Sequence, residues 1–148
     1  MAFRIALYKG TRPGIKGIYN RLVRWWTRSP YSHCELVFSD GVAASSSLED
    51  GGVRFKMIAF DAARWDFIDL PAELESRARA WFEQHVGKKY DVIGNLQFII
   101  ACIPDSHDKW FCSEAVAASL GIADAWRYDP ATLASTLTGV NYSPAVVS

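Results

Sequence analysis

Three strand-like segments, separated by two short glycine-containing connections, are the feature that most constrains the fold. The segments are residues 33–38, 42–47 and 53–58, and the connections are Ser39-Asp40-Gly41 and Glu49-Asp50-Gly51-Gly52. Such connections favour β-hairpins, because aspartate and glycine adopt the backbone angles that tight turns require. We therefore expect three neighbouring antiparallel strands. Residues 3–9 and 66–70 have a similar character and are expected to extend the sheet.

The second half of the sequence has helical periodicity instead. Helices are expected over residues 71–86, 91–103 and 112–120, near Pro130, and, in the first half, over residues 15–27. Gly87 and Gly121 suit the ends of two of these helices. Strands followed by helices indicate an α+β domain, in which a small antiparallel sheet packs against helices.

Length and composition exclude several classes of protein. The 148 residues suit a single domain spanning residues 1–148, and a chain that is 50% hydrophobic and 22% charged is not disordered. Sixteen basic and sixteen acidic residues give no net charge, which argues against a general nucleic-acid binder. We find neither a secretory signal nor an apolar run of about 18 residues, so a cytoplasmic protein is expected.

Basic charge is concentrated near the start of the sequence. Residues 1–34 contain seven Lys or Arg and no Asp or Glu. Three of these arginines share one face of the expected helix 15–27, beside two tryptophans: Arg21, Arg24, Arg28, Trp25 and Trp26. Tryptophan tolerates a boundary between water and apolar material, so this helix suits peripheral contact with an anionic surface. The alternative is an ordinary solvated helix face.

Cys112 is the candidate nucleophile. The sequence has three cysteines without CxxC spacing, which argues against a disulfide framework and for a reducing compartment. Cys112 falls at the expected start of a helix, where backbone N–H groups favour a thiolate and suit an oxyanion. An inert buried cysteine is the alternative. Cys34 and Cys102 are expected to be unreactive and free of disulfides.

A nucleophilic cysteine needs a base, and His33 is the best placed of three histidines. It opens a strand, whereas His85 lies on the apolar stripe of a helix and His107 lies in a polar loop. Strand alternation puts Glu35 on the same face as His33 and Cys34 on the opposite face.

The residue that orients the imidazole depends on the hairpin register. A two-residue connection pairs Glu35 with Ser46, and a three-residue connection pairs Glu35 with Ser45 and His33 with Ser47. Glu35 and the three serines therefore all remain candidates. The alternative for the serines is close packing of small side chains on a helix.

No metal or cofactor is expected. His33 and Cys34 point to opposite faces, and the sequence lacks the spacings typical of zinc, nucleotide or GxSxG sites.

Three short motifs together suggest a family. They are Ser32-His33-x-Glu35-Leu36-Val37, Gly87-Lys88-Lys89-Tyr90-Asp91 and Phe111-Cys112-Ser113-Glu114-x-Val116. Their sequences resemble the NlpC-type papain-like cysteine hydrolases. Because the histidine precedes the cysteine, their order is similar to the circularly permuted branch, which includes the lecithin–retinol acyltransferase relatives. The resemblance spans roughly Arg4 to Leu133.

The resemblance implies a thiol peptidase, amidase or acyl-ester hydrolase or acyltransferase. Cys112 would be the nucleophile, His33 the base and Ser46 the third catalytic residue, while Glu35, Ser45 and Tyr90 would support or line the site. The substrates would be peptides, among them cell-wall peptides, or lipid acyl groups. The alternatives are a non-catalytic peptide- or lipid-binding module on the same fold, and a membrane-surface adaptor that binds through the Trp25-Trp26 helix.

Overall fold

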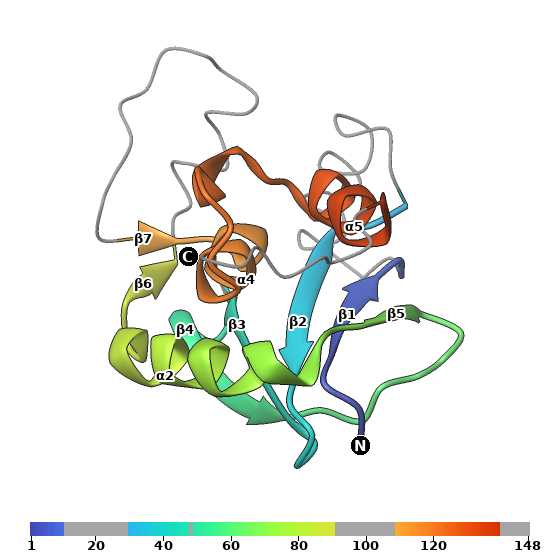
Figure 1. The fold of residues 1–148 in the computed structure, drawn as a ribbon, viewed down its shortest axis with the longest axis horizontal. Coiled ribbons are helices and arrows are strands. Elements are labelled where there is room, and N and C mark those ends of the chain that lie inside the picture. Colours follow the sequence, from blue (N-terminus) through green and yellow to red (C-terminus); the bar gives the residue numbers. More distant parts are fainter. Residues whose placement is uncertain (11–29, 48, 91–108, 140–148) are drawn as a thin grey trace, which may run out of the picture.

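An antiparallel β-sheet is the scaffold of the computed structural model, which describes residues 1–10, 30–47, 49–90 and 109–139 (Figure 1). Its five longer strands are β1 (Arg4–Tyr8), β2 (His33–Val37), β3 (Val42–Ser47), β4 (Gly52–Met57) and β5 (Trp65–Asp69). The two-residue strands β6 (Lys89–Tyr90) and β7 (Lys109–Trp110) complete the order β5-β1-β2-β3-β4-β6-β7. The expected strands are confirmed to within about a residue, whereas β6 and β7 were not predicted.

The β2–β3 hairpin has a three-residue connection. The N–H of Phe38 donates to the carbonyl of Val42, and Leu36 pairs with Ala44. Gly41 closes the connection with a φ of +89°, in the left-handed region that glycine adopts without steric cost. Of the two registers left open by the sequence, this one places Glu35 opposite Ser45, one position beyond the Leu36–Ala44 pair.

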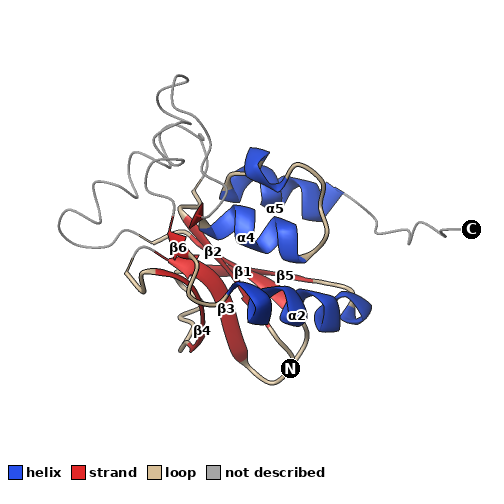
Figure 2. Ribbon diagram, turned by 90° about the vertical axis from the view of Figure 1, so that its left-hand side faces the viewer, coloured by secondary structure: helices blue, strands red, loops and turns tan. Residues whose placement is uncertain are grey.

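The helices lie together on one face of the sheet (Figure 2). The α-helices are α2 (Glu75–His85), α4 (Cys112–Ser119) and α5 (Pro130–Gly139), and the short 3₁₀ helices are η1 (Ala72–Leu74) and η2 (Ala125–Arg127). Gly87 and Gly121 follow α2 and α4 with φ values of +85° and +77°, as their sequence positions predict.

The main hydrophobic core lies between this face of the sheet and the helices. The sheet contributes alternate side chains such as Ile5, Leu36 and Phe38, and the helices contribute Phe82 and Val116. Alternation puts the neighbouring strand residues on the other face, where a second cluster forms around Trp65. The α+β class expected from the sequence is thus confirmed.

Several expectations fall outside the described residues. They are the helices over residues 15–27 and 91–103, and the side chains of Arg21, Arg24, Trp25, Trp26, Arg28, Cys102 and His107. Within the described ranges, no helix has the length and apolar character needed to cross a membrane.

Candidate functional site

Cys112 is the first residue of α4 and is almost completely buried. The preceding residue, Phe111, is extended, so the chain turns from strand to helix at the thiol. Two contacts hold this turn in place: the hydroxyl of Ser46 in β3 donates to the carbonyl of Trp110, and the Trp110 ring packs edge-on against Trp81 of α2. The start of α4 is therefore fixed to the sheet and to α2 before any substrate binds.

His33 begins β2 and interacts with Cys112 by charge and by a side-chain hydrogen bond. Burial lowers the pKa of His33, but the charge and hydrogen bond of Cys112, together with those of Glu35, outweigh burial and raise the pKa to about 10. The imidazole is therefore protonated at neutral pH. The structure brings together the two residues selected from the sequence, which come from opposite halves of the chain.

The pKa of the Cys112 thiol is shifted in the opposite direction to that of His33. A hydrogen bond from Cys34 lowers the pKa of Cys112, burial raises it, and the charge and hydrogen bond of His33 lower it again, leaving it well below its usual range. A thiolate is the nucleophilic form of cysteine. The two pKa shifts therefore favour a thiolate at Cys112 and an imidazolium at His33.

Cys34 lies on the helix-facing side of β2, in the same core cluster as Cys112. It is fully buried and free, as expected, but its closeness to Cys112 was not anticipated. Burial raises the pKa of Cys34, and its hydrogen bond to the negatively charged Cys112 raises the pKa further. Cys34 therefore stays a neutral thiol and donates a hydrogen bond to Cys112.

Brief alkylation of the native protein with iodoacetamide should label Cys112 before Cys34. The reason is that the thiol pKa is lowered at Cys112 and raised at Cys34, and the thiolate is the form that reacts. Peptide mass mapping after quenching measures the order of labelling, and the denatured protein, in which the thiols have similar pKa values, is the control. Labelling of Cys34 first would contradict this assignment.

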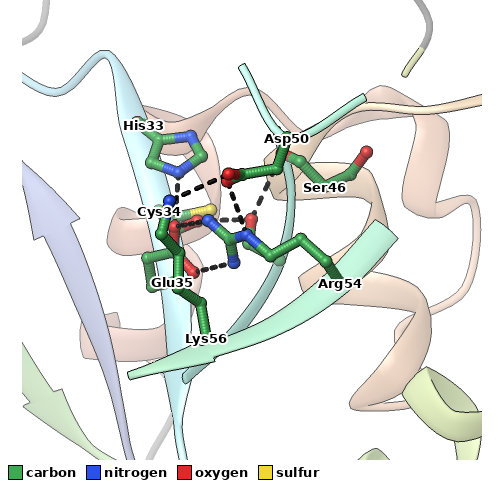
Figure 3. Close-up of polar contacts among 8 residues, drawn as sticks. His33, Cys34, Glu35, Ser46, Asp50, Arg54 and Lys56 are labelled. Carbon is green, nitrogen blue, oxygen red and sulfur yellow. Dashed lines mark hydrogen bonds and ion pairs between the residues drawn. The ribbon is translucent and has the colours of Figure 1, made fainter. Parts of the chain in front are cut away.

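Glu35 orients the imidazole of His33. Nε2 of His33 lies 2.7 Å from Oε1 of Glu35, two positions along the same face of β2 (Figure 3). A carboxylate only accepts hydrogen bonds, so Nε2 carries a proton and donates it. The imidazole thus interacts with Glu35 through Nε2 and also with Cys112. The order thiol, imidazole, carboxylate is the arrangement used to activate a nucleophile.

The Glu35 carboxylate is itself paired. It is 1% exposed, and Nη1 and Nη2 of Arg54 in β4 donate to its two oxygens at 2.6 Å each (Figure 3). Burial raises the pKa of Glu35, but the hydrogen bonds and charges of Arg54 and His33 outweigh burial and leave the pKa below its usual range. Glu35 is thus ionised while buried.

The serines of β3 have other partners, which corrects the expectation that Ser46 orients His33. Ser46 faces the helices and donates to the Trp110 carbonyl, while Ser45 donates to the carbonyl of Cys34 at 2.7 Å. Both are completely buried. Ser45 and Ser46 therefore join β3 to its neighbours, and the hydrogen bond of the imidazole is accepted by Glu35, which the sequence had placed among the candidates.

The structure also describes two other residues considered in the sequence analysis, Tyr90 and His85. The backbone of Tyr90 in β6 pairs in parallel with that of Trp110, two residues before Cys112, and its side chain lies outside the described part of the structure. His85 stacks on Trp81 at 3.9 Å, and its Nδ1 donates to the Trp81 carbonyl at 2.7 Å. His85 thus supports the packing of α2, as its place on the apolar stripe indicated.

Neither a metal site in the described residues nor a match to a family model or a curated protein gives further information on this site. Among the residues that the structure describes, no three His, Cys, Asp or Glu side chains form a group able to hold a metal ion. The sequence matches no protein-family model and no curated protein. The candidate site is therefore interpreted from its own residues.

Proposed function

We propose that the protein is a cysteine hydrolase or acyltransferase with Cys112 as nucleophile, His33 as base and Glu35 as the orienting residue. The observation that carries the proposal is the buried series of Cys112, His33 and Glu35, in which the thiol pKa is lowered and the imidazole pKa is raised to about 10. Buried groups with pKa values moved apart in this way are typical of catalytic sites.

The proposed reaction is acyl transfer through a thioester. The Cys112 thiolate attacks the carbonyl carbon of an amide or ester, and N–H groups at the start of α4 stabilise the oxyanion. Protonated His33 gives its proton to the leaving nitrogen or oxygen as that bond breaks. His33 then takes a proton from water, or from an acceptor alcohol or amine, which attacks the thioester and releases Cys112.

We assign the fold, as part of the same proposal, to the circularly permuted NlpC-type branch. The support is the chain order, since the strand that carries His33 precedes the helix that begins at Cys112 and the sheet separates them in sequence. Of the motifs noted in the sequence, one lies at the start of β2, one at β6 and one at the start of α4. The proposed substrates are accordingly peptides or lipid acyl esters.

The proposal is tested by trapping the acyl-enzyme. Purified protein is mixed with p-nitrophenyl acyl esters of increasing chain length and with peptide p-nitroanilides, and the quenched protein is analysed by mass spectrometry. We expect an acyl adduct on the Cys112 peptide, with release of p-nitrophenol or p-nitroaniline. The adduct should disappear in Cys112→Ala and persist in Arg64→Gln, because Arg64 forms only an exposed ion pair with Asp61.

The opposite outcome is equally informative. If the folded wild-type protein neither releases product nor gains an adduct on Cys112 with any of these substrates, the hydrolase proposal fails. The non-catalytic binding module then becomes the better interpretation of the same site.

A further inference from the structure

Arg54 is the residue that contacts Glu35 directly and that sequence analysis did not select. Its guanidinium forms a fork on Glu35, with Nη1 to Oε2 and Nη2 to Oε1, both at 2.6 Å. Oε1 of Glu35 also accepts from Nε2 of His33 at 2.7 Å. One carboxylate oxygen thus joins the guanidinium directly to the imidazole.

The far side of Arg54 is anchored as well. Its Nε donates to Asp50 at 2.8 Å, and Lys56 donates to the other oxygen of Asp50 at 2.8 Å (Figure 3). Charges therefore alternate along a continuous path from the thiolate of Cys112, through His33, Glu35, Arg54 and Asp50, to Lys56. The Lys56 side chain is 47% exposed, while the Arg54 side chain is only 14% exposed. The path runs from the buried site to solvent.

The small side chains of β3 make this path possible. Ser45 pairs with Arg54 across β3 and β4, and the β2–β3 register puts Glu35 opposite Ser45. Glu35, Ser45 and Arg54 thus form one row on the same face of three adjacent strands. A long side chain at position 45 would fill the space through which the guanidinium reaches Glu35.

A buried carboxylate keeps its charge only with a partner, because burial disfavours the ionised form. Within the described residues, Arg54 is the strongest such partner of Glu35: it is permanently charged, and its planar fork fixes both carboxylate oxygens. Without it, Glu35 would take up a proton or turn away from His33. Either change removes the negative charge that stabilises the imidazolium.

We propose that Arg54 is a positioning residue of the candidate site, which acts through Glu35 by keeping that carboxylate charged and aimed at Nε2 of His33. The catalytic meaning of this role rests on the proposed hydrolase function. The electrostatic link from Arg54 to His33 does not depend on that function and is measured without substrate.

The test combines two variants of Arg54 with two measurements. Arg54→Lys keeps the charge but loses the fork, and Arg54→Gln loses both. The first measurement is the titration of His33 by NMR of ¹⁵N-labelled histidine in a Cys112→Ala background, which removes the contribution of the thiolate. The second is the pH profile of Cys112 alkylation in the otherwise native protein.

We expect Arg54→Gln to lower the His33 titration midpoint by about 1–2 pH units and to raise the Cys112 alkylation midpoint. Arg54→Lys should produce smaller shifts in the same directions, because lysine is a point charge without the planar fork. Arg64→Gln and Arg64→Lys are the matched controls, since Arg64 is 63% exposed and lies 3.5 Å from Asp61. They should leave both midpoints unchanged.

Loss of Arg54 also affects stability, so a third variant keeps the test decisive. In Glu35→Gln/Arg54→Gln no unpaired charge from this pair is buried, and two amides can bond to each other, so we expect it to fold if Arg54→Gln does not. Its His33 midpoint should be as low as that of Arg54→Gln, or lower. Folded Arg54 variants with wild-type midpoints would overturn the proposal. Shifted midpoints in a protein that never forms an acyl adduct would instead retain Arg54's role and reject the hydrolase function.

Discussion

Replacing His33 with alanine is expected to reduce hydrolysis of any substrate that the wild-type protein turns over by about 10²–10⁴-fold. The loss has two sources, because His33 lowers the pKa of Cys112 and, in the proposed reaction, supplies the proton to the leaving group. In the variant, the alkylation midpoint of Cys112 should rise toward the value of about 8.5 typical of a free cysteine. Burial acts in the same direction, because it too raises the thiol pKa.

The measurement is the rate of Cys112 alkylation from pH 5 to 10, together with initial rates of hydrolysis. His85→Ala is the matched control, because His85 contacts Trp81 and Trp110 and not the thiol. It should keep the wild-type alkylation profile, whatever its effect on stability. If His33→Ala and the wild type have the same profile, the start of α4 and Cys34 alone lower the thiol pKa, and His33 is not the base.

Glu35→Gln is expected to have the largest effect on stability, lowering the free energy of unfolding by about 3 kcal/mol. The substitution keeps the shape of the side chain but removes the charge that faces both Arg54 and His33 inside the protein. Among the residues that the structure describes, the guanidinium then keeps Asp50 as its charged partner. Urea unfolding at pH 7 measures the loss. Asp124→Asn, which alters an exposed pair with Arg127 at 3.8 Å, should change stability by less than about 0.5 kcal/mol.

The contribution of Glu35 to the free energy of unfolding should also depend on pH, and it should decrease as the pH falls. Its pKa is below the usual range in the folded protein, so the folded state binds fewer protons there than the unfolded state. The stabilisation is therefore complete above the unfolded value of about 4.3 and is lost as the pH falls through the lower folded value. The difference in free energy of unfolding between the wild type and Glu35→Gln should become smaller below about pH 4. A constant difference across this range would show that the carboxylate charge is not what stabilises the fold.

Much of the architecture follows from local sequence patterns. Alternation and glycine-containing turns locate the hairpins, and helical spacing with terminal glycines locates the described helices. The strands β6 and β7 were missed because two residues carry no periodic signal. Their pairing depends on long-range contacts that bring Tyr90 beside Trp110.

The residues that meet at the candidate site were mostly selected from the sequence, but their arrangement was not fully predicted. A cysteine at a helix start and a histidine at a strand start were sufficient to select Cys112 and His33. The choice between Glu35 and the serines required the hairpin register, which depends on whether two or three residues connect the strands. Arg54 is one strand further away, so its role depends on two registers at once. An arginine within an expected strand, two strands away from a glutamate that would be buried, was the available signal.

His33 and Cys112 lie on elements that are distant in sequence, and they meet only when α4 packs on the sheet. Until then Cys112 is an ordinary thiol, since neither the imidazolium nor the hydrogen bond from Cys34 acts on it. During synthesis on the ribosome, the Cys112 thiol would therefore be unreactive, and it would become reactive only when α4 packs on the sheet. Because the reactivity of Cys112 depends on this packing, the rate at which Cys112 becomes reactive during refolding measures how fast the helices pack on the sheet.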